Sequence, residues 1–449
     1  DFCLSRGLGD VYKRQVQERG GHWNAYTSVN RTVYYIDGPA DSWQIFLNLL
    51  TELVFFPTFP EDELEREKGV VRREMAMYAD DPDSVAYQLL MQTLYLKHPR
   101  RWPVLGEPAA FDCLTRQDVL DYHASRYVPN NVVLSIAGDV DAAEIFSHLE
   151  LLVEDLKSRP LNRELIPHEP HQFGSRRVRK EFAVPYSKLN LAWRLPCSGH
   201  PDTPALSALA SILGGGRSAR FYEKFHDRLG LVYSIEVHSN QSETDEGAFT
   251  ISIDVDRAQR DKVRDLVLQE LRNLAQEDFT EDLKRVCKQT RVSRLRRRSS
   301  AAGVASEMGA DWFGARNLNL SSEWQEAIER VTTEDLHRVC STWLSSPNVT
   351  EVSLDPVGSN AAEEDGSAAG TETALSEHVL GNGMKVVIRE DHRLPLAYAC
   401  LAFKAGCRAE NEHDAGVTDL MSECLLKGTA TRSAGDIARF LEDIGGAIN

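Results

Sequence analysis

The chain alternates short apolar runs at strand spacing with longer runs at helix spacing. Thr32–Ile36 (TVYYI) predicts a strand, and Asp41–Phe56 predicts an amphipathic helix. Pro60–Tyr78 predicts a second helix, because Pro60 suits a first helical turn and acidic residues follow it directly. A strand followed by amphipathic helices is typical of an α+β domain, in which helices cover a sheet.

The same order of elements recurs farther along the chain. Phe249–Val255 predicts a strand, Asp261–Ala275 a helix, and Glu281–Arg285 the start of the next helix. Leu64 then aligns with Leu283, 219 positions later. The repeat predicts two related α+β domains in tandem.

Two glutamates, Glu67 and Glu74, lie on the stripe of the predicted helix that should be apolar. At about 100° per residue, the stripe also contains Leu64, Val71, Met75 and Tyr78. Unpaired carboxylates against a core are costly, so a metal, or a partner that holds one, would explain them. The alternative is a stripe edge that faces water, with both glutamates solvated.

The second copy of the repeat separates these alternatives. Val286 takes the place of Glu67, and Ser293 takes the place of Glu74. A requirement of the core would recur in both copies, so the difference favours a chemical role for the glutamates of the first copy.

A longer repeat joins the two ends of the chain. Gly20-Gly21-His22-Trp23-Asn24 recurs 425 positions later as Gly445-Gly446-Ala447-Ile448-Asn449. We therefore expect the chain to run from the middle of one module to the same point of the next, truncated at both ends of a tandem protein.

These repeats predict the domain organisation. Residues 1–15 fit no element, resemble translated adapter sequence and are set aside as a non-native segment. The first domain is predicted over residues 16–172, with a strand at Val132–Ala137, and the second over residues 173–357. Residues 358–375 are small and acidic, which predicts a flexible linker. Residues 376–449 begin a third domain, whose apolar residues around Leu420–Leu426 we expect to be poorly covered.

Composition narrows the function classes. Lys+Arg 51 against Asp+Glu 68 gives a net charge of −17, which argues against nucleic acid as the main partner. We expect the basic run Arg291–Arg298 to be a solvated helix face.

No apolar run approaches the ~20 residues of a transmembrane helix. The eight cysteines form no Cys-x-x-Cys pair, so a thiolate zinc site is not supported. His168-Glu169-Pro170-His171 could ligate a metal, but its proline and loop setting favour incidental linker residues.

Several stretches, in order, match one known family. Gly20–Ser28 is similar to a Gly-Gly-x-x-Asn-Ala-x-Thr strand, and Pro60–Tyr78 to a glutamate-bearing helix. The further matching stretches are Tyr127–Asn131, Ala137–Val140, Leu213–Ser218, Gly230–Ser234, Leu380–Met384 and Lys427–Thr429. Together they resemble the pitrilysin/insulinase family of zinc metallopeptidases, which includes mitochondrial processing peptidase.

The resemblance implies two-layer α+β domains, each with an antiparallel-rich sheet covered by helices. Two domain pairs would close as a clam around a peptide or unfolded polypeptide, so that a second module of the same chain completes the chamber. The resemblance also implies Zn²⁺, held by two histidines of an inverted His-x-x-Glu-His motif and by a distant glutamate. Glu74 matches that metal ligand. Glu67 matches the upstream acid, a catalytic-site residue that orients a ligand.

The resemblance also implies substrate-binding residues. Asn24 and Ala25 match the strand that pairs with the substrate backbone. His226 and Tyr233 match an arginine–tyrosine pair that holds substrate. Histidine is only partly charged near neutral pH, so substrate clamping is less secure here. The alternative is that His226 is a surface side chain and Tyr233 a strand residue.

The chain departs from the family pattern at the metal-binding motif. No His-x-x-Glu-His occurs in the 449 residues, and the longer repeat places the motif immediately before residue 1. In the third domain Asp419, Ser422 and Glu423 stand at the motif positions, so this degenerate module is expected to be inert. We expect a fragment of a zinc metalloendopeptidase that is inactive alone. The alternative is a non-catalytic scaffold or binding subunit.

Overall fold

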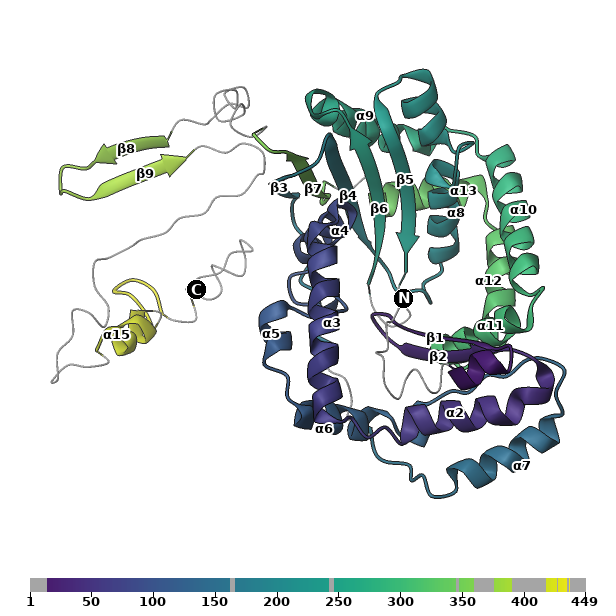
Figure 1. Cartoon of the computed structure of the whole chain (residues 1–449). Coiled ribbons are helices and arrows are strands. Elements are labelled where there is room, and N and C mark those ends of the chain that lie inside the picture. The colour runs from purple at the N-terminus through teal and green to yellow at the C-terminus, as the bar shows by residue number, and fades with distance from the viewer. Residues whose placement is uncertain are drawn as a thin grey trace. The chain divides into compact units, whose positions relative to one another are not determined.

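In the first predicted domain two strands precede a run of helices, whereas in the second domain helices separate the strands (Figure 1). The computed structural model describes residues 14–161, 166–241, 246–344, 347–358, 375–389, 417–425, 427–433 and 436. The chain divides into two units, Asp1–Ser367 and Ala368–Asn449. This division falls inside the predicted linker, while the individual domain boundaries stay predictions. The described part of the chain has no helix long and apolar enough to cross a membrane.

From residue 22 onward, the described part of the first domain has a short hairpin and six α-helices. β1 (His22–Thr27) pairs antiparallel with β2 (Thr32–Asp37), and Asn24 lies opposite Tyr35. The helices are α2 (Trp43–Phe55), α3 (Glu61–Asp80), α4 (Pro82–Leu94), α5 (Pro108–Asp112), α6 (Arg116–Arg126) and α7 (Ala142–Val153). The predicted strand at residues 32–36 and the predicted glutamate helix are therefore confirmed.

The strand predicted at Val132–Ala137 is wrong. This segment forms no strand, and Val132, Val133 and Leu134 are exposed. A strand needs a neighbour for its backbone groups, and the described sheet of this domain contains only β1 and β2. The segment meets α11 (Ala301–Ala315) instead, where the Ser135 hydroxyl donates to the Ala305 carbonyl at 2.8 Å.

The second domain is built on a five-stranded sheet in the order β3-β7-β4-β6-β5. Its strands are β3 (Arg176–Phe182), β4 (Ser187–Leu195), β5 (Val232–Asn240), β6 (Gly247–Val255) and β7 (Thr350–Pro356). All neighbours are antiparallel except β3 and β7. β7, the last strand of this domain in the chain, therefore lies between β3 and β4.

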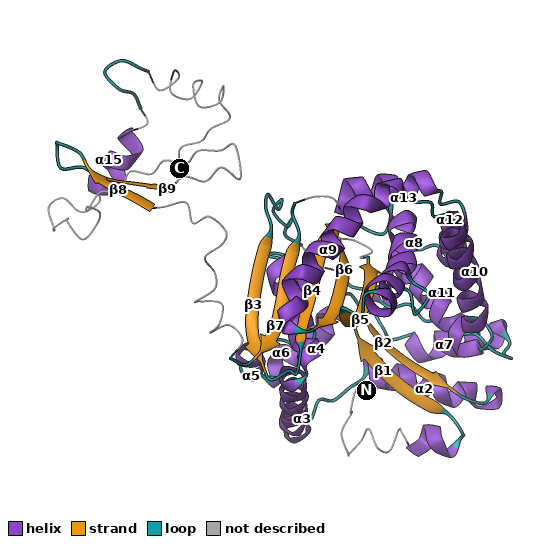
Figure 2. Ribbon diagram, turned by 90° about the horizontal axis from the view of Figure 1, so that it is seen from above, coloured by secondary structure: helices purple, strands orange, loops and turns teal. Residues whose placement is uncertain are grey.

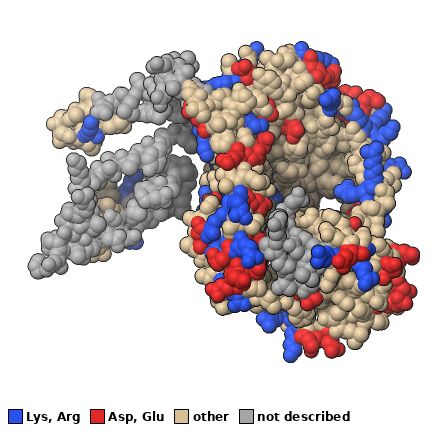
Figure 3. Space-filling view, viewed as in Figure 1, with Lys and Arg blue, Asp and Glu red and all other residues tan. Residues whose placement is uncertain are grey.

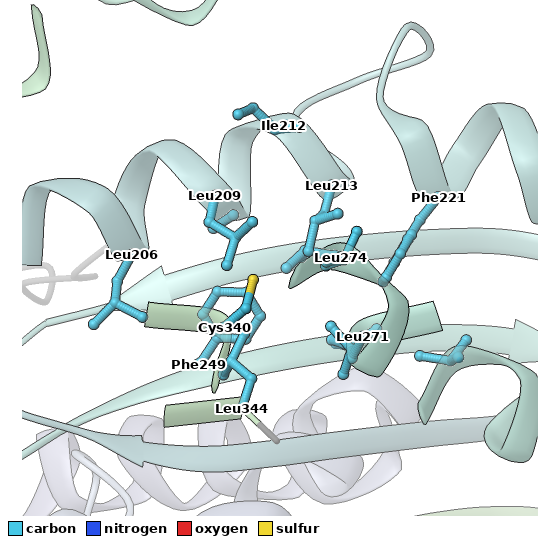
Figure 4. Close-up of a cluster of buried hydrophobic side chains, with 14 of the residues drawn as sticks. Leu206, Leu209, Ile212, Leu213, Phe221, Phe249, Leu271, Leu274, Cys340 and Leu344 are labelled. Carbon is cyan, nitrogen blue, oxygen red and sulfur yellow. The ribbon is translucent and has the colours of Figure 1, made fainter. Parts of the chain in front are cut away.

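One face of this sheet holds the main core. The remaining helices are α8 (Thr203–Gly214), α9 (Arg260–Asn273), α10 (Thr280–Arg297), α12 (Leu320–Glu329) and α13 (Thr333–Val339). Leu206, Leu209 and Leu213 of α8 pack toward Phe249 of β6 and Cys340 (Figure 4). Alternate residues of β4, among them Leu189, Leu191 and Trp193, belong to this core.

The opposite face of the same sheet is closed by a helix from the first domain. The C-terminal half of α4 packs on Ala192 of β4 and Val352 of β7. It does so through Leu90, Leu94 and the C-cap residue Tyr95. Figure 2 shows α8 and α13 on one side of the sheet and α4 on the other. The two domains of this unit therefore share a buried apolar layer.

The C-terminal unit contains a hairpin and a helix among its described residues. β8 (Leu375–Val379) pairs antiparallel with β9 (Lys385–Arg389), and α15 spans Val417–Leu425. Leu420, Met421 and Leu425 are exposed, which confirms the expected poor cover of this segment.

Candidate active site

The glutamate helix α3 begins and ends as its sequence predicts. Pro60 precedes it in an extended conformation, and Glu61, Asp62 and Glu63 occupy the first turn. Acidic side chains stabilise a helix N-terminus through the helix dipole. At the other end, Asp81 caps α4 by accepting the Ser84 backbone N–H at 2.9 Å. A single residue thus separates α3 from α4.

The loop before α3 is held in a strained conformation. Phe59 has a φ of 45°, a left-handed value that L-residues rarely adopt. The Arg116 guanidinium donates to the carbonyls of Phe59 at 2.6 Å and Thr58 at 3.0 Å. These bonds fix the point from which α3 departs.

Basic residues of α3 hold one side of the helix. The Lys68 ammonium donates to the Leu114 carbonyl at 2.8 Å, and Arg72 donates to the Asp112 carboxylate at 2.7 Å. At 100° per residue, Lys68 and Arg72 lie well round the helix from Glu67 and Glu74. The glutamate face therefore points away from the α5–α6 connection. In Figure 3, acidic and basic side chains mix over the surface along α3.

The glutamate stripe is less buried than the sequence indicates. No residue of α3 is fully buried; Glu67 and Glu74 are half-buried, and Tyr78 is exposed. The two glutamates are therefore neither enclosed in an apolar core nor fully solvated. The packing partners of α3 are mainly α4 and α5, which leave the glutamate face partly open.

Glu67 carries a polar atom that the described residues do not satisfy. Its Oε1 is buried and has no hydrogen-bond partner among them. An unsatisfied buried acceptor costs about 1–3 kcal/mol, and more when it is charged. Such a cost points to a cation or a donor as the partner of this carboxylate.

The described residues do not fit a complete zinc site. Nowhere in the part of the chain that the structure describes do three His, Cys, Asp or Glu side chains gather at metal-binding distance. Catalytic zinc sites use about three protein ligands, whereas α3 supplies two carboxylates. Asp419, Ser422 and Glu423 lie on α15, but their side chains are outside the described residues.

Asn24 and Ala25 lie in the middle of β1. The backbone N–H of Ala25 donates to the Asn24 side-chain oxygen at 2.8 Å. The two positions before the strand require glycine for different reasons. Gly20 has a φ of 72°, which other residues rarely adopt, and a side chain at Gly21 would meet Val16 and Phe46 at 2.9 and 3.0 Å. Among the described strands, β1 has a neighbour on one edge only, which is β2.

His226 and Tyr233 contact different neighbours. His226 stacks on Tyr222 with ring centroids 4.3 Å apart and bonds Asp227 at 2.7 Å, in a π-helical turn over Tyr222–Arg228. Tyr233 is exposed on β5 and packs on the Tyr186 ring at 5.1 Å. None of the contacts described for these residues joins one to the other, so their shared role stays a prediction.

Glu169 is a buried carboxylate whose role its sequence setting does not reveal. Glu169 accepts the backbone N–H groups of Leu96, Lys97 and His98 at 2.6, 2.8 and 2.9 Å. Burial alone would raise the pKa of Glu169, but these three donors hold it below the ordinary value. Glu169 therefore anchors the end of α4, and its reading as an incidental linker residue is wrong.

The basic run at the end of α10 is mostly solvated, as expected. Arg291, Arg296 and Arg297 are exposed, and Figure 3 shows basic side chains gathered along this helix. Arg294 and Arg298 are the exceptions, because both bond the buried Glu307 carboxylate, at 3.0 and 2.9 Å.

Comparison with known proteins identifies the family. The model described as "Insulinase (Peptidase family M16)" matches residues 8–107 and 385–449, and that of the "Peptidase M16 inactive domain" matches residues 114–289. The chain belongs to the insulinase (M16) peptidase family. The resemblance found in the sequence and the antiparallel-rich α+β fold that it implied are thereby confirmed.

Relatives of this insulinase-family chain are named as zinc proteases. An uncharacterized zinc protease of Rickettsia felis is 25% identical over 74% of this chain and 80% of its own length. The zinc protease PqqE of Helicobacter pylori is 26% identical over 77% of this chain and 79% of its own length.

Solved structures agree with this family. The chain is similar to a protease from Helicobacter pylori, with a TM-score of 0.69, 25% identity, and coverage of 77% of this chain and 84% of that one. An M16 inactive domain from Pseudomonas fluorescens shares the fold, with a TM-score of 0.70 and 21% identity over 79% of this chain and 84% of that one.

Proposed function

We propose that this chain belongs to a zinc-dependent endopeptidase that cleaves peptides or unfolded polypeptides. The observation that carries the proposal is the pair of glutamates on one half-buried face of α3, with Glu67 Oε1 buried and unsatisfied. The names of the relatives support zinc and proteolysis. Glu74 would supply one carboxylate to the metal, and Glu67 would orient a ligand.

The other zinc ligands have to be side chains other than those described. The proposed source is a His-x-x-Glu-His segment, which the 449 residues do not contain. This chain alone is therefore proposed to bind zinc weakly and to hydrolyse no peptide. Bound zinc would supply Lewis-acid and water-activating chemistry.

Substrate would be held as an extended strand. The edge of β1 that has no described neighbour, at Asn24 and Ala25, can pair with a peptide backbone. Tyr233, exposed on β5, and His226 are proposed to contact the same peptide, and a second module of the same chain would close over it. Figure 3 shows the surface hollowed between the second-domain sheet and the β1–β2 hairpin, where a peptide could enter.

Zinc stoichiometry tests the proposal. The chain would be compared with a version extended by any sequence encoded in frame upstream of Val16 that contains His-x-x-Glu-His. We expect weak binding by the chain and one tightly bound zinc in the extended form, with cleavage of a quenched fluorescent peptide. Glu74→Gln should abolish tight binding, whereas the exposed control Glu65→Gln should not.

The alternative is a non-catalytic binding or assembly subunit of the same fold. The buried, unsatisfied Glu67 Oε1 opposes it. An extended chain that carries His-x-x-Glu-His but binds no zinc would establish this alternative.

A further inference from the structure

The position of the glutamate helix is not set by its own packing. α3 has no fully buried residue, so it lacks the apolar anchor that usually fixes a surface helix. One side is tied to Asp112 and Leu114 through Lys68 and Arg72. Its C-terminal end continues, through Asp81 alone, into α4. The orientation of Glu67 and Glu74 therefore depends on what holds α4.

α4 is held by the second domain over its C-terminal half. Its apolar face packs on β4 and β7. At its C-terminal end, the Tyr95 hydroxyl donates to the carbonyls of Gly247 at 3.1 Å and Glu246 at 3.0 Å. Glu169 binds the three backbone N–H groups that follow α4. These contacts fix α4 from its middle to its end.

A lysine of the second domain contacts the other end of α4, beside the junction with α3. The Lys188 ammonium, on β4, donates to the Asp83 carboxylate at 2.6 Å and to the Asp254 carboxylate at 3.0 Å. Asp254 also accepts the Ser234 hydroxyl at 3.0 Å. The Lys188 side chain is only 11% exposed, whereas that of Asp83 is 78% exposed. The lysine is therefore the buried, fixed member of the pair, and Asp83 is the member that it holds.

The chemistry of this contact suits positioning better than bulk stabilisation. An ion pair with one solvated member contributes about 0.2–1 kcal/mol, which is too little to maintain the fold. Asp83, however, lies two residues after the junction residue Asp81. A small angular change there displaces the far end of a 20-residue helix, which is about 30 Å long, by several ångströms.

We propose that Lys188 and Asp83 are positioning residues through which the second domain orients the glutamate helix α3. The domain matched by the "inactive domain" model would thus serve the candidate site directly, by fixing the helix that carries Glu67 and Glu74. The inference deepens the proposed function and rests on it for its biological meaning. The structural claim itself concerns only α3, α4 and β4.

Hydrogen exchange of the metal-free chain tests this inference. Lys188→Met and Asp83→Asn should each speed amide exchange in peptides covering residues 61–80, by about two- to fivefold. The double variant should exchange no faster than either single one, because both remove the same contact. Lys188→Arg keeps the charge and should restore most of the protection. Lys180→Met, an exposed lysine on β3, is the matched control and should change nothing.

Peptides from β4 and β6 separate positioning from a general loss of stability. If Lys188→Met speeds exchange equally in these strands, or leaves residues 61–80 unchanged, the inference is wrong. Since the measurement needs no metal, it stands apart from the zinc test. A chain that shows the expected exchange but never binds zinc would refute the proposed function and leave the positioning role intact.

Discussion

α3 and α10 occupy the same place in the repeat, yet they are used differently. α10 buries Leu283 and Val286 in the main core, and Val286 is 3% exposed. α3 buries no residue, and Glu67 stands where α10 has Val286. One position is thus a packing site in the second domain and a half-buried carboxylate in the first. The fold can therefore hold an apolar residue at this position of the predicted repeat, and a chemical role for Glu67 stays a prediction.

The largest expected effect comes from moving the carboxylate into the second copy. Val286→Glu would place an unpaired charge in a closed core, so we expect a loss of about 5 kcal/mol in the free energy of unfolding, or no cooperative unfolding at all. Urea denaturation followed by tryptophan fluorescence measures it. Val286→Leu is the size control. A loss below about 1 kcal/mol for the glutamate variant would mean that the two positions are interchangeable and the comparison fails.

The second domain also depends on a buried ion pair for which no counterpart is described around α3. Asp355 and Arg260 are fully buried and bonded to each other, and Ser187 and Ser353 donate to Asp355 at 2.6 and 2.7 Å. Asp355→Asn should cost about 3 kcal/mol at neutral pH, because the buried Arg260 guanidinium then keeps only the partly exposed Asp261 carboxylate as a counter-charge. Equilibrium unfolding at pH 7 gives this value, and Asp265→Asn, at an exposed site on α9, is the control.

The same pair predicts how stability depends on pH. Burial alone would raise the pKa of Asp355, but the two hydroxyl donors and the Arg260 charge outweigh burial and hold it below the ordinary 3.8. A lowered native pKa contributes stability above about pH 4, which is lost as pH falls through the native value. We expect the wild-type unfolding free energy to fall more steeply below pH 4 than that of Asp355→Asn. Parallel profiles would contradict this.

The phenylalanines before the two helices offer a third contrast. Phe279 is completely buried, and Phe279→Ala should cost about 3–4 kcal/mol through the cavity that it leaves. Phe59, at φ 45°, is half-buried. Phe59→Gly should cost less than 1 kcal/mol, because glycine relieves the left-handed strain that opposes the lost packing. Thermal unfolding of both variants checks that Phe279→Ala loses more stability than Phe59→Gly. Equal losses would contradict this prediction.

The smallest effect concerns Glu67 itself. In the metal-free chain, Glu67→Val removes a buried acceptor that lacks a donor, and we expect an unchanged stability or a gain of up to about 1 kcal/mol. Valine lowers helix propensity slightly, so Arg73→Val, at an exposed position on α3, provides the reference. A clear loss for Glu67→Val relative to Arg73→Val would show that the carboxylate has a structural partner.

Local patterns located the elements that the sequence predicted, with one exception, because periodicity and end signals reside in neighbouring residues. β2, α3, β6 and α9 are found close to their predicted ranges. The strand at Val132–Ala137 failed because a strand depends on a neighbour that no local pattern specifies.

Long-range contacts could not be predicted from local sequence patterns for the same reason. Lys188 and Asp83 lie 105 positions apart, and Glu169 lies 73 from Leu96. The residues next to Lys188 or Glu169 in the sequence do not indicate which distant residue each side chain contacts. The glutamate pair could be found because both members stand on one helix, whereas its degree of burial depends on neighbours such as α4 and α5.

The insertion of β7 between β3 and β4 has a consequence for the newly made chain. The surface that receives α4 includes Val352, so it is incomplete until the ribosome has passed Pro356. At about 5–20 residues per second, the roughly 260 residues between Leu94 and Pro356 take on the order of 10–50 s to synthesise. Once β4 and β6 have been made they can pair, but β7, which completes the sheet under α4, is still missing. The apolar face of α4 therefore gains its full cover only when the last strand of the second domain has been made.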